Sequence, residues 1–505
     1  MRTQYGYWAL HPKTPPARPV VRRIVEILLL SFLLISFPSI KGSASATNPN
    51  SGSKPILQSG ATSPSQIYLP VILATGSQPT PRVNIPYFAT DIDFSQAAIF
   101  WLGQVTPTQN YTDVRVGYDP QELWIFLTTI DHSLWYQPTP PPSEITLWDS
   151  ATLYISLKGN LGNTIDNQTF RFDGQLSNFE PGDKYQAAYS GSNAGWKMVS
   201  LPFITWAGWR GNALNSPNSG DGWTIGYRIP FTSLGLTGLP TEGTVWGLGV
   251  AVHDRDTQSG PPNPDQTWPS KFNPSVPTTW GQIRFGLPAY HPPVGVAPSQ
   301  EIKIRNGLDG TNIDDAMVGG SRTCGQGLSD YWSQWGLANY QNEVQLNIQN
   351  QYDVADWPCF SKFYITFPLD KIPPGKVILS AALTLNFFGN AGGGQWGPPP
   401  KSLIQVFTVG QDWDKSTINW NNAPQAIENV SRAWVYPISS WPPDVPYHWD
   451  LSYAVNQAYQ AGIPLRLALY SADYPRHTGK YFWSSQVGDW DANSRPTLDI
   501  TVGAP

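Results

Sequence analysis

The frequency of proline and glycine sets the strongest limit on how this chain folds. The 505 residues include 49 Pro and 45 Gly, about one such residue in every five or six. Proline removes a backbone donor, and glycine costs about 1 kcal/mol in a helix interior. Coiled coils and helical bundles are therefore excluded. The chain is also 40% hydrophobic with 23 Trp, which is enough apolar surface to exclude a wholly disordered chain.

The N-terminal 46 residues have the order of a secretory signal peptide. Basic residues precede an uncharged apolar run, Ile27–Ile40, and Ala44-Ser45-Ala46 follows as a small-x-small cleavage site. The run is shorter than the roughly 20 residues that span a bilayer. We expect a secreted, extracellular or cell-surface protein with no membrane insertion after cleavage. A retained signal anchor is the alternative, because the basic segment is long.

Charge restricts the partners. The signal takes six of the 31 basic and one of the 36 acidic residues, which leaves a net charge of −10. Nucleic acids and anionic membrane surfaces reward clustered Lys and Arg. Neither is an expected partner of this chain.

Composition divides the remainder into two modules joined by linkers. Residues 47–82 are rich in Ser, Thr, Pro and Gly, as in a disordered linker, and residues 288–300 form a second, Pro-rich spacer. Between and after them, at 83–287 and 301–505, short β-branched and aromatic runs alternate with turn residues. Asp113–Tyr118 and Leu123–Leu127, for example, predict a hairpin. We expect an all-β protein with two antiparallel β-sandwiches in tandem, of Ig-like or jelly-roll type.

One helix is predicted, at 452–461. Ser452 is placed as its N-cap, and Gly462 ends it. The two cysteines of the chain, Cys324 and Cys359, predict a disulfide, because an even cysteine count outside the cytosol usually forms one.

Three stretches of the first module resemble the family nine carbohydrate-binding modules, which are related to the DOMON sandwiches. These are DVRVGYDPQELWIFLTTID (113–131), LWDSATLYISL (147–157), and VWGLGVAVHDRD with TWPSKFNPSVPTTWGQIRFG (245–256 and 267–286). In that family two tryptophans sandwich a sugar ring, and Trp148 and Trp268 occupy the matching places. Core packing of these two residues is the alternative. Asp131 and Asp149 lie in the same stretches, and the resemblance implies that they organise the site or a calcium ion.

The second module resembles the DNRLRE domains. The matching motifs are SKFYITFPLDKIPPGKVILSAALTL (361–385), DWDKSTINWNNAP (412–424), and FWSSQ with RPTLDITV (482–486 and 495–502). The hexapeptide that names the family is absent. The resemblance implies a sandwich more firmly than a ligand, and Trp413 and Trp420 are interpreted as structural.

Further candidates rest on residue type alone. Aromatic side chains in loop-like surroundings are typical of contact surfaces, and those chosen as carbohydrate-binding, beside Asp149, are Trp206, Trp209 and Trp396. Four Asp-x-Asp pairs could chelate Ca²⁺. A structural calcium ion is predicted as the one cofactor, with Asp131, Asp254 and Asp256 as its candidate ligands.

The sequence shows no HExxH, GxSxG, P-loop or CxxC motif. The predicted function is therefore non-catalytic binding of a polysaccharide or cell-wall glycan through aromatic platforms on a secreted protein. A structural or adhesive surface protein is the first alternative. A glycan-degrading hydrolase with an unrecognised carboxylate pair is the second.

Overall fold

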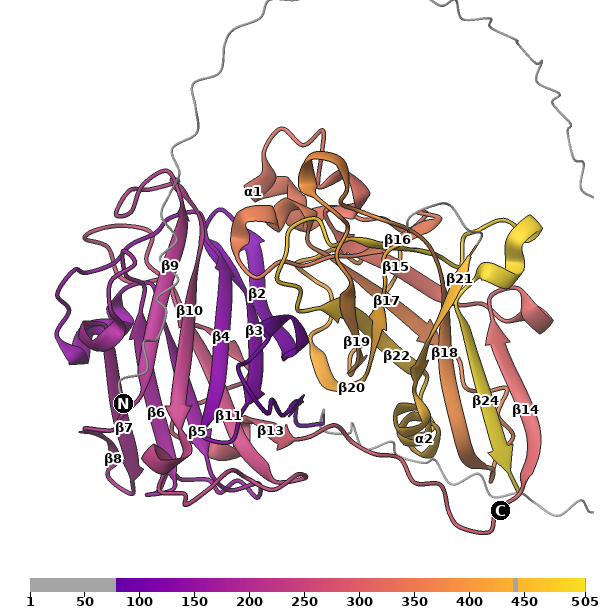
Figure 1. Cartoon of the computed structure of the whole chain (residues 1–505), viewed down its shortest axis with the longest axis horizontal. Helices are drawn as coiled ribbons and strands as arrows, with labels where there is room; N and C mark the ends of the chain where they lie inside the picture. The colour runs from indigo at the N-terminus through magenta and orange to yellow at the C-terminus, as the bar shows by residue number, and fades with distance from the viewer. Residues whose placement is uncertain (1–78, 439–443, 505) are drawn as a thin grey trace, which may run out of the picture. The chain divides into compact units, whose positions relative to one another are not determined.

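The computed structural model describes residues 79–438 and 444–504. The predicted signal peptide and residues 47–78 of the predicted linker lie outside this part. The described residues are mostly β-strands with short helical turns (Figure 1), so the all-β prediction is confirmed. No helix among them has the length and apolar character needed to cross a membrane.

The strands fall into two sets along the chain. The first set is β1 Arg82–Ile85, β2 Ala98–Thr106, β3 Gln109–Tyr118, β4 Glu122–Ile130, β5 Ser150–Ser156, β6 Thr169–Gln175, β7 Gln186–Ser192, β8 Gly195–Val199, β9 Ile204–Gly211, β10 Gly220–Pro230, β11 Val245–His253, β12 Gln266–Trp268 and β13 Gly281–Phe285. The second set is β14 Pro298–Arg305, β15 Asp314–Gly319, β16 Gln345–Ile348, β17 Ser361–Phe367, β18 Val377–Asn390, β19 Ser402–Val409, β20 Ala426–Val435, β21 Val445–Asp450, β22 Leu465–Ser471, β23 Lys480–Trp483 and β24 Thr497–Gly503. Strand β14 begins inside the stretch predicted as the second spacer.

The first set packs as a sandwich. A five-stranded sheet of order β2-β3-β4-β10-β9 faces the strands β1-β13-β11-β5-β6-β7-β8. The hairpin predicted around residues 119–122 is the antiparallel pair β3 and β4. Alternate residues such as Leu153 and Ile155 of β5 are buried between the layers. The other residues of the same strands consequently face away from this core.

The second set forms another sandwich. Strands β15-β17-β22-β19-β20 face a six-stranded sheet of order β14-β24-β18-β23-β16, in which β21 pairs with β18. The predicted helix is present as α2 (Ser452–Ala461), and Gly462 ends it in the left-handed conformation at φ 65°. The N-cap prediction is wrong, because Leu451 holds that position. The Asp450 carboxylate instead accepts from the Ser452 backbone N–H at 2.9 Å. A second, short helix is α1 (Tyr331–Gln334).

The two sets share one sheet. Strand β1 pairs in parallel with β13 of the first set and with β20 of the second. One continuous sheet therefore runs from β15 at one edge to β8 at the other. The Asn84 and Asn429 side chains reinforce this junction, because each amide nitrogen donates to the other residue's backbone oxygen, at 2.7 and 2.8 Å. The described residues accordingly form one compact unit.

A third buried cluster contains residues from both sets. At its centre lies Lys362 of β17, which is fully buried. Its Nζ donates to the Tyr111 hydroxyl at 2.8 Å and lies 4.2 Å from the ring centre of Trp101 and 3.8 Å from that of Trp420. Burial holds the pKa of Lys362 well below its ordinary value, and nearby Asp113 opposes that effect. The seam between the sandwiches is thus polar and aromatic.

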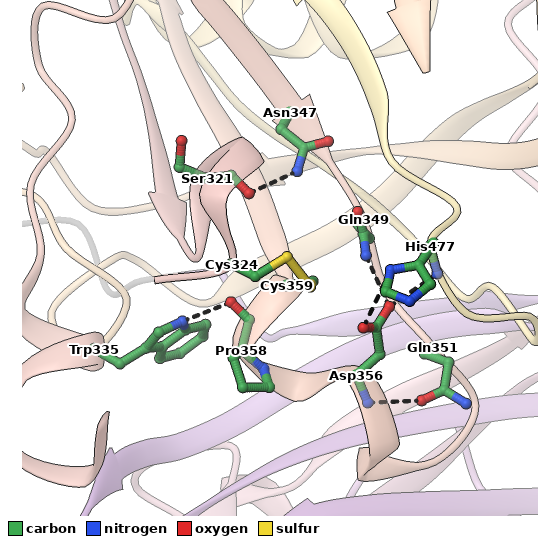
Figure 2. Close-up of a disulfide and its surroundings, with 10 residues drawn as sticks. All are labelled: Ser321, Cys324, Trp335, Asn347, Gln349, Gln351, Asp356, Pro358, Cys359 and His477. Carbon is green, nitrogen blue, oxygen red and sulfur yellow. Dashed lines mark hydrogen bonds and ion pairs between the residues drawn. A yellow bond between two sulfur atoms is a disulfide. The ribbon is translucent and has the colours of Figure 1, made fainter. Parts of the chain in front are cut away.

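The predicted disulfide is confirmed: Cys324 and Cys359 are bonded, 35 residues apart in sequence. Figure 2 shows that the Trp335 indole lies beside it, where its Nε1 donates to the Pro358 carbonyl at 2.9 Å. The bridge therefore joins the loop that follows β15 to the segment that precedes β17.

Candidate functional site

A polar row crosses the outer face of the sheet that contains β5, β6, β7 and β11. Tyr154 of β5, Arg171 of β6 and Tyr189 of β7 are register partners on three neighbouring strands. Thr152 lies beside Asp173 in the same way. These residues alternate with core residues, so they share the face turned away from the core.

Hydrogen bonds link this face into one network. The Arg171 guanidinium donates to both carboxylate oxygens of Asp173, at 2.8 and 2.7 Å. The Thr152 hydroxyl donates to Asp173 at 2.8 Å and lies 2.9 Å from Nε2 of His253. Nδ1 of His253 lies 2.7 Å from the half-exposed Asp265 carboxylate. Thr152, Asp173 and His253 are buried, so the line reaches solvent only at its ends, at Arg171 on β6 and at Asp265 in the loop after β11.

Aromatic rings border the network. The Arg171 guanidinium lies 4.6 Å from the centre of the partly exposed Tyr189 ring and 6.0 Å from that of Tyr154. Burial raises the pKa of Tyr154, whose ring packs 4.9 Å from Phe272. The Tyr189 hydroxyl donates to the Pro142 carbonyl at 3.2 Å, which ties β7 to the short helix η2 (Pro142–Leu147).

Trp148 follows η2 directly and is half-buried. The Arg255 guanidinium lies 4.7 Å from its ring centre and also donates to the Leu147 carbonyl at 2.6 Å. One face of the indole is thus covered by a side chain of this protein. Asp149 is fully buried and accepts from the backbone N–H groups of Trp135 and Arg255, at 2.6 and 2.9 Å. Asp149 supports the loop and does not face solvent, contrary to its prediction as a sugar ligand.

The prediction that Trp268 faces Trp148 across a sugar is wrong. Trp268 is 1% exposed, belongs to the first core, and lies 4.2 Å from the Phe100 ring. The reason is register: Trp268 pairs with Val250 of β11, and Val250 points inward. The indole consequently enters the core, and the alternative of core packing holds for this residue.

The other predicted aromatics lie on separate elements. Trp206 of β9 lies in the five-stranded sheet, 6.1 Å from the Trp124 ring. Trp209, on the same strand, donates to the Asn178 side chain at 3.0 Å. Trp396 belongs to the second set, is 55% exposed and lies 4.1 Å from the His477 ring. Neither Trp206 nor Trp396 is on the strands that carry the polar row.

The three predicted metal ligands are brought together. One carboxylate oxygen from each of Asp131, Asp254 and Asp256 lies within 4.8 Å of the others. Burial and the neighbouring Asp254 hold the pKa of Asp131 well above its ordinary value, and burial raises that of Asp254 to about 7. The Asn263 amide donates to Asp254 and to Asp256, at 2.8 Å each, yet Oδ1 of Asp254 is buried without a partner in the described part of the chain. The oxygen-only donors and this unpaired atom fit a calcium ion.

A second group of metal-ligating residue types is Asp356, Cys359 and His477 (Figure 2). Its sulfur is already bonded to Cys324. One carboxylate oxygen of Asp356 accepts from the Gln349 amide and from the His477 backbone, at 2.9 Å each. The group is therefore explained by internal contacts.

The network of Arg171, Asp173, His253 and Asp265 was not predicted from the sequence. The signal that could have identified part of it is the alternation in Phe170-Arg171-Phe172-Asp173, where charged residues interrupt an apolar strand at every second position. His253 and Asp265 lie some eighty residues or more from that strand, and only the pairing of β5 with β6 and β11 joins them to it.

No family model and no curated protein matches the chain. Among solved structures, a family nine carbohydrate-binding module from Caldicellulosiruptor kristjanssonii, in complex with cellotriose, is 14% identical and has a TM-score of 0.30. The match covers 43% of this chain and 99% of that one. A family nine module from the same organism in complex with glucose is also 14% identical, with a TM-score of 0.29. That match covers 42% of this chain and 100% of that one. A protein from Bacteroides uniformis is 12% identical and has a TM-score of 0.32. The match covers 41% of this chain and 99% of that one. At such identities and scores, nothing that these proteins bind is carried over to this chain.

Proposed function

We propose that this chain is a secreted, non-catalytic carbohydrate-binding protein, and that the outer face of β5, β6, β7 and β11 binds the sugar. The observation that supports the proposal is the partly exposed Arg171 guanidinium beside the Tyr189 ring, which the buried Asp173 carboxylate fixes through two hydrogen bonds. A pyranose combines apolar C–H patches with a rim of hydroxyls. It therefore suits an aromatic ring next to fixed polar groups.

The way the network is held also favours binding over catalysis. Asp173 is buried, and Arg171 occupies both of its oxygens. A glycosidase needs one carboxyl group that gives a proton and a second that acts as nucleophile or base. Asp173 is thus better suited to orienting donors than to transferring a proton.

Because Trp268 lies in the core, Trp148 is the one tryptophan of the predicted pair that we expect to stack on the sugar. Because Arg255 covers one side of the indole, only the other side is left for a ligand. We expect a single stacking contact, which corresponds to modest affinity, and a polysaccharide or cell-wall glycan as the natural partner. The disulfide supports placement outside the cytosol.

The test is isothermal titration of soluble glycans found on a glycan array, with the 79–505 chain. Trp148→Ala and Arg171→Ala should each weaken binding by about tenfold or more, since lost contacts of 1–3 kcal/mol correspond to such factors. Trp490→Ala is the matched control, because it removes an indole that is 80% exposed and lies in the second half. Unchanged affinity in both site variants would contradict this location. Release of reducing ends from a bound glycan would show that the chain is an enzyme.

We also propose that Asp131, Asp254 and Asp256 bind a structural calcium ion that fixes the loop after β11. Calcium at a hundredfold excess over its Kd should stabilise the fold by about 2.7 kcal/mol, seen as a higher Tm. Asp254→Asn should abolish this shift, whereas the exposed Asp91→Asn should retain it. A Tm that does not respond to calcium or to a chelator would refute the proposal.

A further inference from the structure

Trp413 is interpreted from the sequence as structural, yet it lines a hollow that the motif at 412–424 forms at the surface of the second sandwich. The hollow has a volume of about 420 Å³ and lies in the loop between β19 and β20. Its lining consists of Asp412, Trp413, Asp414, Thr417, Ile418 and Asn422. This volume is within the range of small-molecule sites, about 300–1,000 Å³.

The walls of this hollow are held in place by the loop itself. The Asp414 carboxylate accepts from the backbone N–H and the hydroxyl of Ser416, at 2.7 Å each. The Asn422 amide donates to the Thr417 carbonyl at 2.9 Å, and its oxygen accepts from the Asn419 N–H at 2.7 Å. The loop's own hydrogen bonds therefore fix the shape of the hollow.

Trp413 provides the aromatic wall. It is half-buried, with its ring edge-on to Tyr364 at 6.1 Å, so the packing fixes its orientation. Its Nε1 is shielded from solvent and has no hydrogen-bond partner among the described residues. Nε1 of the buried Trp420 is likewise without a partner among these residues, so this donor does not distinguish a ligand-binding indole from a structural one.

The polar groups that remain for a ligand are mostly acceptors. Both amide groups of Asn422 are used within the loop. Asp412 pairs with Nε of Arg466 at 3.1 Å, but its side chain is 82% exposed. Asp414 has no ion-pair partner in the described part of the chain, and its hydrogen bonds from Ser416 both reach Oδ1, which leaves Oδ2. The contacts with Ser416 lower the pKa of Asp414, so the carboxylate is charged at neutral pH.

We propose that this hollow binds an amino sugar whose amine is protonated, with the pyranose ring against Trp413 and the ammonium group at Asp414. An ammonium donates three hydrogen bonds and accepts none, which matches two carboxylates better than a neutral hydroxyl does. An aromatic face next to the carboxylates adds cation–π attraction. This inference goes beyond the proposed function, because it concerns a different site and a cationic ligand class.

The experiment titrates the 79–505 chain with a glucosamine tetramer at pH 6 and low salt, and in parallel with the N-acetylated tetramer. The glucosamine tetramer should bind, and the acetylated one should bind at least tenfold more weakly, because acetylation removes the charge. Asp414→Asn should weaken glucosamine binding by about tenfold, the factor expected for a charge-assisted hydrogen bond. Trp413→Ala should weaken it further.

Three controls distinguish loss of binding at this hollow from misfolding and from loss of the first site. Asp414 is at the surface and asparagine retains an acceptor for Ser416, so this variant should fold, which circular dichroism checks. Trp148→Ala should leave glucosamine binding unchanged even if the first site proves wrong. Asp370→Asn removes an exposed carboxylate elsewhere. Equal binding of both tetramers, an unaffected Asp414→Asn variant, or an equal loss in Asp370→Asn would each overturn the proposal.

Discussion

Replacing Asp113 by Ala should cost more stability than almost any other single change in this protein. Asp113 is fully buried in β3, where it accepts from the hydroxyls of Tyr111 and Tyr470 and from the Asn350 amide, at 2.7, 3.0 and 3.1 Å. Two of these donors belong to the second set of elements and one to the first. The carboxylate also opposes the loss of charge on buried Lys362. Its removal leaves three buried donors without an acceptor.

The expected magnitude follows from these contacts. Each lost hydrogen bond costs about 1 kcal/mol net, and an unpaired buried donor costs more. Three such contacts are lost together, each at about 1–1.5 kcal/mol. We therefore expect the free energy of unfolding of Asp113→Ala to be lower by about 3–5 kcal/mol. That is a large part of the 5–15 kcal/mol typical of a folded domain.

Equilibrium urea unfolding, followed by tryptophan fluorescence, measures this loss. Asp113→Asn is the informative companion, because it keeps an acceptor oxygen but removes the charge, and it should fall between the wild type and Asp113→Ala. The exposed Asp370→Asn should remain within about 0.5 kcal/mol of the wild type. A loss below 1 kcal/mol in Asp113→Ala would refute the view that this carboxylate holds the seam together.

Three further changes test other parts of the fold. The double variant Cys324→Ser, Cys359→Ser opens a loop with a sequence separation of 35 and should lose about 4 kcal/mol in urea unfolding; an unchanged midpoint would contradict the chain-entropy argument. Gly226→Ala would place a Cβ 2.0 Å from the Trp206 ring, so the indole must move, at a cost of about 1–3 kcal/mol and with altered fluorescence; native stability and an unchanged spectrum would show that the ring does not lie there. The Asp315 carboxyl is fully buried, and burial raises its pKa to about 6. The folded protein then binds this proton more tightly than the unfolded chain, so stability falls as pH rises from about 4 to about 6. Asp315→Asn removes this dependence, and its stability relative to wild type should improve by up to about 3 kcal/mol over that interval. A difference that is constant with pH would contradict the assignment.

Local sequence patterns were sufficient to predict several strands, one hairpin and the longer helix. The turn residues Asp119-Pro-Gln-Glu122 predicted the hairpin of β3 and β4, and Gly462 predicted the end of α2. The disulfide was predictable because a pair of cysteines allows one internal bridge. Each of these inferences depends on neighbours along the chain or on a count, which the sequence contains directly.

The candidate site was less predictable. Asp254 and Asp256 were named as an Asp-x-Asp pair and Asp131 on the resemblance, and the fold does bring the three together. Trp268 was named on the same resemblance, but the register of its strand points its side chain into the core. A shift of one residue in register moves a side chain from one face of a sheet to the other, and no local pattern fixes that choice.

The sequence by itself determined that this chain forms short strands, two apolar cores and one internal disulfide, because proline, glycine and apolar spacing act over a few residues at a time. Only the tertiary structure decided that β1 joins both sandwiches into one sheet, that Lys362 lies in an aromatic seam, and that Arg171, Asp173 and His253 share a face. These arrangements depend on pairing between strands that are distant in sequence. Pairing is set by the packing of whole faces against each other.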